Sequence, residues 1–136
     1  MNNTSSGDRE HGCDVVVVDD DADILHLLVS HIKEKGIRVK GLRSGVELAD
    51  IIASERPRLL LLDVLMPVFN GYALYDSIKE ETARIGTRVY FISALPERNL
   101  KWSVQTSGAA GYITKPFSMA DIDAVLAEAG ISAGSR

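Results

Sequence analysis

The sequence lacks the features that mark disulfide-linked, membrane-spanning or strongly basic proteins. Its single cysteine, Cys13, has no second cysteine with which to form an intrachain disulfide. No uninterrupted apolar run approaches the roughly 18 to 20 residues of a membrane-spanning helix. Lys and Arg total 15 against 19 Asp and Glu, and the net charge of -4 disfavours direct binding to nucleic acid or to an anionic membrane. We therefore expect a cytoplasmic protein that contacts neither.

The length and hydrophobic content suit one domain. The chain has 136 residues, of which 46% are hydrophobic, enough for one core but too few for two domains of ordinary size. Residues 1–12 are polar and lack the basic start and apolar stretch of a signal peptide. We predict a flexible tail over 1–12, a domain over 13–130 and a second tail over 131–136. About twenty residues follow Lys115, so we expect no output domain here and expect the signal to pass to another protein.

Short apolar runs predict the strands of a buried sheet. Three uninterrupted runs of four apolar residues are bounded by polar or turn residues, as in strands buried on both faces. Two weaker segments lie beside Gly or Pro. The expected strands are Val15–Val18, Ile37–Leu42, Leu59–Leu62, Val89–Ile92 and Gly111–Thr114.

Segments with helical spacing separate these strands. Each carries an apolar stripe at three- and four-residue intervals, and the stripes comprise Ile24, Leu25, Leu27, Leu28 and Ile32; Val46, Leu48, Ile51 and Ile52; Ala73, Leu74 and Ile78; Leu100 and Val104; and Ile122, Val125, Leu126 and Ala129. Strand and helix thus alternate five times. This alternation predicts an α/β fold with a parallel sheet, right-handed crossovers and helices on both faces.

Acidic, hydroxyl and basic side chains follow the predicted strands. Asp19 and Asp20 follow the first strand, Asp63 the third, Ser93 the fourth and Lys115 the fifth. Ligands of open parallel sheets bind at the carboxyl ends of the strands. Two like charges about 4 Å apart repel by about 4 kcal/mol at an effective dielectric near 20. A divalent cation among the carboxylates, Mg²⁺ or Mn²⁺, would relieve this repulsion, and a protonated carboxyl is the alternative.

The same residues fit phosphoryl transfer. A carboxylate beside such a cation is an adequate nucleophile toward phosphorus, and Asp63 has the central position. Lys115 and the Ser93 hydroxyl could then contact the new phosphoryl oxygens. A simpler interpretation also exists, because an Asp after a strand is often only a helix N-cap. The joint placement at neighbouring strand ends favours the functional interpretation.

Four segments resemble the receiver domain of two-component response regulators. They are V-V-V-V-D-D from Val15, L-L-L-D-V-L-M-P from Leu60, F-I-S-A from Phe91 and G-Y-I-T-K-P-F from Gly111. Thirty residues separate Asp63 from Ser93, and twenty-two more lead to Lys115, as in that family. The resemblance implies a flavodoxin-like (βα)5 fold of the single-domain chemotaxis kind, with strand order 2-1-3-4-5.

The resemblance also implies roles for individual residues. Asp63 is similar to the phosphoacceptor that takes a phosphoryl group from a phosphohistidine. The acidic pair Asp19 and Asp20, with Asp63 and the main-chain carbonyl of Leu65, resembles the Mg²⁺ ligands. Lys115 resembles the phosphate-binding lysine, and its bond to Pro116 is expected to be cis. Ser93 and Tyr112 resemble the two residues of the family's conformational switch. Ser93 is similar to the switch hydroxyl, and Tyr112 to the aromatic residue that moves with it.

The implied partners are proteins. They are a sensor histidine kinase or histidine phosphotransfer protein and an unidentified downstream target, and the chain itself would be a monomer or a weak homodimer through its last helix-strand-helix face. It would not be an enzyme beyond its own phosphorylation and dephosphorylation. We interpret Asp21 as an acid of the first helical turn, and Trp102 as an outward side chain that either anchors a partner or covers a neighbouring helix.

Two leucines depart from common patterns in the family. Leu65 lies two residues after Asp63, and Leu95 lies two after Ser93, at places where the family tunes hydrolysis of the acyl phosphate. Apolar side chains there should hinder the attacking water. The sequence therefore favours a comparatively long-lived phosphorylated form.

Two alternative functions compete with this interpretation. The run V-V-V-V-D-D-D also fits a phosphohydrolase of the haloacid dehalogenase type, with Asp19 and Asp21 as its acids. That hypothesis leaves Asp63 without a role, and the sequence lacks the later acidic pair that such an enzyme would need. The second alternative is a receiver-like scaffold that works without phosphorylation by dimerising through its last helices, and the intact set of site residues argues against it.

Overall fold

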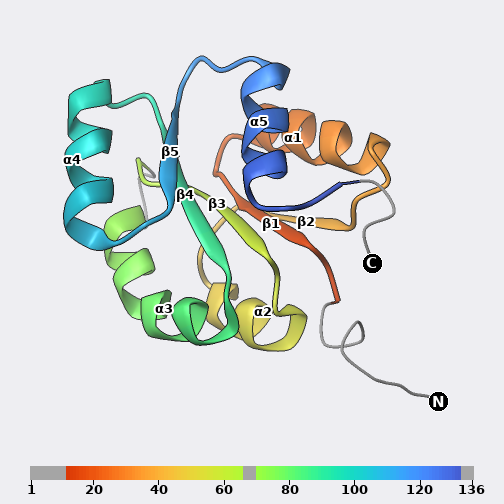
Figure 1. Ribbon diagram of the computed structural model, residues 1–136, viewed down its shortest axis with the longest axis horizontal. Helices are drawn as coiled ribbons and strands as arrows, with labels where there is room; N and C mark the ends of the chain where they lie inside the picture. Colours follow the sequence, from red (N-terminus) through yellow and green to blue (C-terminus); the bar gives the residue numbers. More distant parts are fainter. Residues whose placement is uncertain (1–11, 66–69, 133–136) are drawn as a thin grey trace.

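The computed structural model describes residues 12–65 and 70–132, which form five strands and five helices in strict alternation (Figure 1). In chain order the elements are β1 (Val15–Val18), α1 (Ala22–Glu34), β2 (Val39–Leu42), α2 (Leu48–Glu55), β3 (Leu59–Asp63), α3 (Gly71–Ile85), β4 (Arg88–Ser93), α4 (Glu97–Ser107), β5 (Gly111–Thr114) and α5 (Met119–Glu128).

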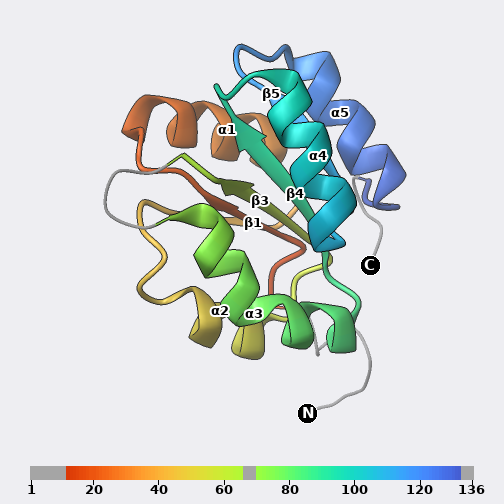
Figure 2. The same ribbon diagram turned by 90° about the vertical axis from the view of Figure 1, so that its left-hand side faces the viewer.

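The strands form one parallel sheet in the order β2-β1-β3-β4-β5. The predicted fold class and strand order are therefore confirmed. Viewed from the side, helices α1 and α5 lie on one face of the sheet and α2, α3 and α4 on the other (Figure 2). Because β1 and β3 lie inside the sheet, the residues that follow them lie near the middle of its carboxyl edge.

Two apolar cores hold these layers together, one on each face of the sheet. Alternate residues of β1 point to opposite cores: Val15 and Val17 pack with α1 and α5, whereas Val16 and Val18 pack with α2, α3 and α4. All four valines are buried, and burial of one such side chain contributes about 1.5 to 3 kcal/mol. The uninterrupted apolar runs in the sequence thus reflect strands covered on both sides.

Side-chain caps begin helices α1 and α3, which follow strands β1 and β3 of the sheet. The Asp21 carboxylate accepts hydrogen bonds from the N–H groups of Asp23 and Ile24, and Asn70 accepts one from Tyr72. Asp21 is therefore the N-cap of α1, one position before the first-turn placement that we had predicted. Such a cap contributes about 1 kcal/mol because it satisfies N–H groups that have no partner inside the helix.

Some expectations about individual residues were wrong. The strand expected from Ile37 begins at Val39, because β1 offers only four partners for pairing, and Ile37 instead packs in the core beside α1. Leu27 is 50% exposed because it lies off the stripe that α1 buries, and Val46 is 72% exposed because it precedes α2. Periodicity could not reveal either exposure, because the facing layer decides which apolar positions are covered.

Two further expectations concern the ends of the chain and membranes. The predicted tails, 1–12 and 131–136, lie largely outside the described residues, and the domain boundaries stay a prediction. Within 12–65 and 70–132, no helix combines the length and the apolar character that crossing a membrane requires.

Candidate functional site

Three carboxylates meet at the carboxyl ends of β1 and β3. Asp19 and Asp20 follow β1, Asp63 ends β3, and one oxygen of each lies within 4.8 Å of the others. Asp19 and Asp63 are buried and Asp20 is half-buried. The predicted convergence of these acids is confirmed, and it follows from the parallel register in which β1 and β3 pair side by side.

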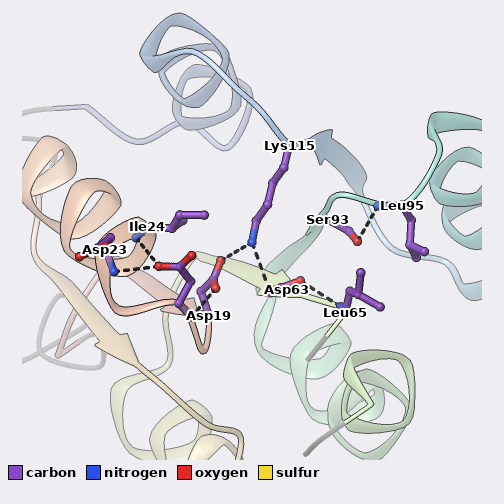
Figure 3. A network of polar contacts seen from close by, with 9 residues as sticks. Asp19, Asp23, Ile24, Asp63, Leu65, Ser93, Leu95 and Lys115 are labelled. Atoms are coloured by element: carbon purple, nitrogen blue, oxygen red, sulfur yellow. Dashed lines mark hydrogen bonds and ion pairs between the residues drawn. The ribbon is translucent and has the colours of Figure 1, made fainter. Parts of the chain in front are cut away.

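Local backbone contacts orient the two buried carboxylates. Asp19 Oδ1 accepts a hydrogen bond from the Asp21 N–H, and Asp63 Oδ1 accepts one from the Leu65 N–H, both at 2.9 Å. Each bond spans two residues, as Asp commonly does in turns. The second oxygen of each carboxylate faces the Lys115 side chain between the strands (Figure 3).

Lys115 places its ammonium group between the two buried acids. Its Nζ lies 2.9 Å from Asp19 Oδ2 and 3.2 Å from Asp63 Oδ2. The Lys115 main-chain N–H donates to the carbonyl oxygen of Ser93 at 2.8 Å, which ties the end of β5 to β4. The peptide bond from Lys115 to Pro116 is cis, as predicted.

The pKa values of the site respond to burial and to these charges. Burial raises the pKa of Asp63 to about 6, helped by the charge of Asp19, although the Leu65 hydrogen bond and Lys115 oppose the rise. Burial acts to lower the pKa of Lys115, but the two carboxylates outweigh it and leave that pKa above its ordinary value. At neutral pH the site therefore holds an ionised Asp63 beside a charged lysine.

The oxygen donors fit a hard divalent cation. Asp19 Oδ2 is buried and has no hydrogen-bond partner among the described residues, because its contact with Lys115 is close in distance but lacks hydrogen-bond geometry. The Lys115 ammonium, 2.9 Å away, balances the charge of this buried oxygen, and a divalent cation bound there would add to that balance. Three carboxylates from two strand ends, all offering oxygen, match the ligand preference of Mg²⁺ or Mn²⁺.

Ser93 ends β4 beside this cluster. Its side chain is fully buried, and its Oγ accepts a hydrogen bond from the Leu95 N–H at 3.1 Å (Figure 3). Because that bond uses an oxygen lone pair, the hydroxyl keeps its proton for donation. Ser93 is therefore chemically able to donate to an oxygen placed near Asp63.

Tyr112, the predicted switch residue, lies in β5 and contacts α4. Its hydroxyl donates a hydrogen bond to Glu97 Oε2 at 2.7 Å. This bond, with a smaller effect of burial and the charge of Glu97, raises the pKa of Tyr112. Our sequence reasoning missed Glu97, because fifteen residues separate the pair and no periodic pattern links the start of a helix to a strand that follows it.

The other singled-out residues lie at the surface or outside the described chain. Leu65 is 55% exposed and Leu95 is half-buried. Trp102 points outward as predicted, with 66% of its surface exposed. The segment L-L-L-D-V-L-M-P begins at Leu60, and its last two residues fall within 66–69, which lie outside the described residues.

Comparison with known proteins identifies one family. The sequence model of the response regulator receiver domain matches residues 15–127. A transcriptional activator protein, PfeR of Pseudomonas aeruginosa, is 34% identical over 110 residues, which cover 81% of this chain and 35% of PfeR. The DNA-binding transcriptional regulator NtrC of Escherichia coli is 33% identical over 113 residues, 83% of this chain and 23% of NtrC. This chain thus spans well under half the length of these two relatives.

Solved structures agree with that match. A response regulator receiver protein from Burkholderia phymatum has a TM-score of 0.72 at 31% identity, over 88% of this chain and 97% of that one. The apo receiver domain of nitrogen regulatory protein C has a TM-score of 0.74 at 30% identity, over 86% of this chain and 93% of that one. Neither comparison gives support to a phosphohydrolase of the haloacid dehalogenase type.

Proposed function

We propose that this chain, which belongs to the response regulator receiver domain family, accepts a phosphoryl group on Asp63 from the phosphohistidine of a sensor histidine kinase or a histidine phosphotransfer protein. One observation carries the proposal. The Asp63 carboxylate ends a central strand within reach of two more acids and of the Lys115 ammonium. Receiver domains are signalling domains, and the phosphoryl group would serve as the signal.

A divalent cation, Mg²⁺ or Mn²⁺, is part of this proposal. Asp19, Asp20 and Asp63 would hold it, together with the main-chain carbonyl of Leu65. The buried Asp19 Oδ2, which makes an ion pair with Lys115 but no hydrogen bond within the described residues, supports this assignment. When bound, the ion supplies positive charge that reduces repulsion between the carboxylates and an incoming phosphoryl group.

The transfer step needs an ionised Asp63 and a group that balances the charge of the phosphoryl oxygens. With a pKa of about 6, Asp63 is mostly a carboxylate at neutral pH, so a nucleophilic oxygen is available. This oxygen would form the new bond to phosphorus as the bond from phosphorus to the histidine nitrogen breaks, and the imidazole leaves. Lys115 already lies 3.2 Å from Asp63 Oδ2 and would contact a phosphoryl oxygen there.

The signal would leave the site through Ser93 and Tyr112. A phosphoryl oxygen on Asp63 would accept a hydrogen bond from the Ser93 hydroxyl and draw the end of β4 inward. Tyr112 would then exchange its hydrogen bond with Glu97 for a more buried position, which changes the surface near α4. A shift of the ratio of the switched to the unswitched conformation from 1:99 to 99:1 requires roughly 5.5 kcal/mol of differential interaction. A few charge-assisted hydrogen bonds to the phosphoryl group can supply much of this free energy.

The proposed output is contact with another protein. We propose that the phosphorylated form recruits or releases a downstream protein target, as a monomer or as a weak homodimer through α4, β5 and α5. We also propose that the exposed Leu65 and the half-buried Leu95 prolong the acyl phosphate by hindering water.

Phosphorylation by a small donor tests the proposal without knowledge of the kinase. Wild-type protein incubated with acetyl phosphate and Mg²⁺ should gain the mass of one phosphoryl group, and Asp63→Asn should not. Asp76→Asn is the matched control, because Asp76 is an exposed acid of α3 remote from the strand ends. Loss of the mass gain in Asp76→Asn, or its persistence in Asp63→Asn, would contradict the assignment.

Two further measurements separate the alternative functions. Turnover of p-nitrophenyl phosphate that survives Asp63→Asn but disappears in Asp19→Asn would support the phosphohydrolase hypothesis. A wild-type protein that never gains a phosphoryl group, yet self-associates through its last helices, would support the scaffold hypothesis.

A further inference from the structure

A groove lies between α3 and α4, away from the carboxylate cluster. It encloses about 460 Å³ and is lined by Tyr72, Tyr75 and Lys79 of α3 and by Trp102 and Thr106 of α4, among others. The two helices are neighbours on the flank of the sheet opposite α1 and α5 (Figures 1 and 2). The proposed phosphorylation chemistry assigns no task to this groove.

The floor of the groove is already ordered. The rings of Tyr72 and Tyr75 both pack edge to face against the buried Phe91 of β4, with centroid distances of 5.5 and 5.3 Å. Ser103 Oγ and the Tyr72 hydroxyl lie 2.9 Å apart and share a hydrogen bond, which links α4 to α3 across the base of the groove. A ligand would therefore meet a preformed aromatic surface and lose little free energy to ordering it.

The wall of the groove carries the largest exposed aromatic side chain of the described residues. Trp102 is 66% exposed, and within residues 12–65 and 70–132 no partner accepts a hydrogen bond from its indole N–H. Tryptophan with an apolar face and an available donor is the residue type most enriched among binding hot spots. Trp102 thus offers both contact area and one polar anchor to an occupant.

The surface of α4 carries two exposed cations near Trp102. Arg98 lies one helical turn before Trp102 and Lys101 directly precedes it, and both cations are exposed without an ion pair in the described part of the chain. The only acid of α4, Glu97, already accepts the Tyr112 hydrogen bond. On the α3 side, Lys79 is paired with Asp76 at 3.0 Å. The hydrogen bond from Tyr112 leaves Glu97 negatively charged, so α4 carries two positive side chains and one negative one. Its excess positive charge lies at Arg98 and Lys101, next to Trp102, in a chain whose overall charge is -4.

We propose that this groove docks an amphipathic helical segment of a partner protein, with apolar side chains against Trp102 and Tyr72 and with carboxylates facing Arg98 and Lys101. Tyr75 is only 7% exposed and supports the floor from below. A helix that binds in a groove inserts apolar residues spaced by three, four and seven positions. Such a row of side chains fits a groove bounded by two helices. Opposite charge on the occupant fixes its orientation and speeds association.

A second copy of this chain fits the groove less well than an acidic partner. A symmetric dimer would bring the same surface of two copies together, so Arg98 and Lys101 of one copy would approach the same cations of the other. This repulsion disfavours self-association through the groove. The docking proposal does not depend on phosphorylation of Asp63, and its test uses protein without phosphoryl donor.

The test is a selection from a displayed library of helical peptides whose charges and apolar positions vary at random. We expect enriched peptides to carry net negative charge and apolar residues spaced by three, four and seven positions. Titration of one enriched synthetic peptide should change the fluorescence of Trp102, the only tryptophan of the chain. Trp102→Ala should weaken binding, followed by the anisotropy of a labelled peptide, about tenfold or more.

Matched variants separate docking from non-specific attraction. Lys101→Glu should also weaken binding severalfold, whereas Leu27→Ala and Lys33→Glu, which alter an exposed apolar and an exposed basic residue of α1, should leave it unchanged. Circular dichroism should show that each variant is folded. The proposal is overturned if no peptide is enriched, if the enriched peptides are basic, if Trp102→Ala binds as tightly as wild type, or if sedimentation shows a dimer that Trp102→Ala abolishes.

Discussion

The Tyr112 hydroxyl donates a 2.7 Å hydrogen bond to Glu97 Oε2, and this bond joins the side chain of a β5 residue to the first turn of α4. Both residues lie near the surface, so the bond can exchange with water when either side chain moves. In the proposed switch, this hydrogen bond holds the Tyr112 side chain outward. Movement of Ser93 toward a phosphoryl group must therefore stabilise the inward position of Tyr112 by more than this bond is worth. Glu97 keeps its negative charge in this contact, so α4 carries one negative side chain against its two positive ones, Arg98 and Lys101.

Replacement of Glu97 should change the titration of Tyr112. Glu97 raises the pKa of Tyr112 mainly because its carboxylate accepts a hydrogen bond from the neutral phenol, and also because a phenolate beside a carboxylate is unfavourable. In Glu97→Gln the neutral amide removes that repulsion, so the pKa of Tyr112 should fall toward its ordinary value of 10.0. A pH titration by NMR with isotope-labelled tyrosine measures this shift. Glu80→Gln, which changes an exposed acid of α3, should leave the Tyr112 resonance unaffected.

The raised pKa of Asp63 predicts how the stability of the metal-free protein depends on pH. The folded pKa of about 6 lies above the ordinary value of 3.8, so between these values the folded protein binds more protons than the unfolded chain. The contribution of Asp63 to the free energy of unfolding is therefore largest below about pH 4. It decreases as the pH rises to about 6, by an amount on the order of 2 to 3 kcal/mol.

Asp63→Asn should lack this dependence because an amide does not ionise. In chelator-treated samples the variant should melt at a higher temperature than wild type at pH 7, and the difference should shrink at pH 4. Thermal denaturation followed by circular dichroism at several pH values is the measurement. An Asp63→Asn variant that is less stable than wild type at pH 7 would show that burial does not dominate the electrostatics of this site.

Removal of Lys115 should make the protein more responsive to divalent cations. Lys115→Ala leaves the buried Asp19 and Asp63 without the ammonium that lies between them, which should lower the free energy of unfolding by about 3 kcal/mol without metal. Millimolar Mg²⁺ should then raise the melting temperature of Lys115→Ala more than that of wild type, because the ion no longer competes with a fixed positive charge. Lys33→Ala, on the exposed side of α1, is the control, and equal shifts in all three proteins would argue against a cation among these acids.

A polar residue at position 65 should shorten the lifetime of the phosphorylated protein. Leu65 follows Asp63 by two residues and is 55% exposed, so its apolar side chain lies on the path proposed for water. Leu65→Asn should speed loss of the phosphoryl group about tenfold, equivalent to about 1.4 kcal/mol in the barrier. Decay of purified phosphoprotein, followed by mass spectrometry after removal of the donor, gives the rate. Leu27→Asn changes a similarly exposed leucine of α1 that is not among the site residues, and this variant should decay like wild type.

Much of the site could be predicted because it depends on features that are local in sequence. Four-residue apolar runs gave the core of every inner strand, and the residue after each run marked the carboxyl edge of the sheet. Parallel pairing of β1 with β3 then requires Asp19 and Asp63 to be neighbours. The resemblance to receiver domains added the strand order and the cis bond before Pro116, and both were confirmed.

The fold class, the alternation of elements and the meeting of three acids were thus predictable from the order of the residues, because strand periodicity and crossover geometry leave few other arrangements. The packing of the layers in three dimensions established which apolar helix positions are covered, as the exposure of Leu27 shows. It also paired Tyr112 with Glu97 and opened a groove between α3 and α4. These features depend on the angle and distance at which packed layers meet, and no local pattern of residues encodes that geometry.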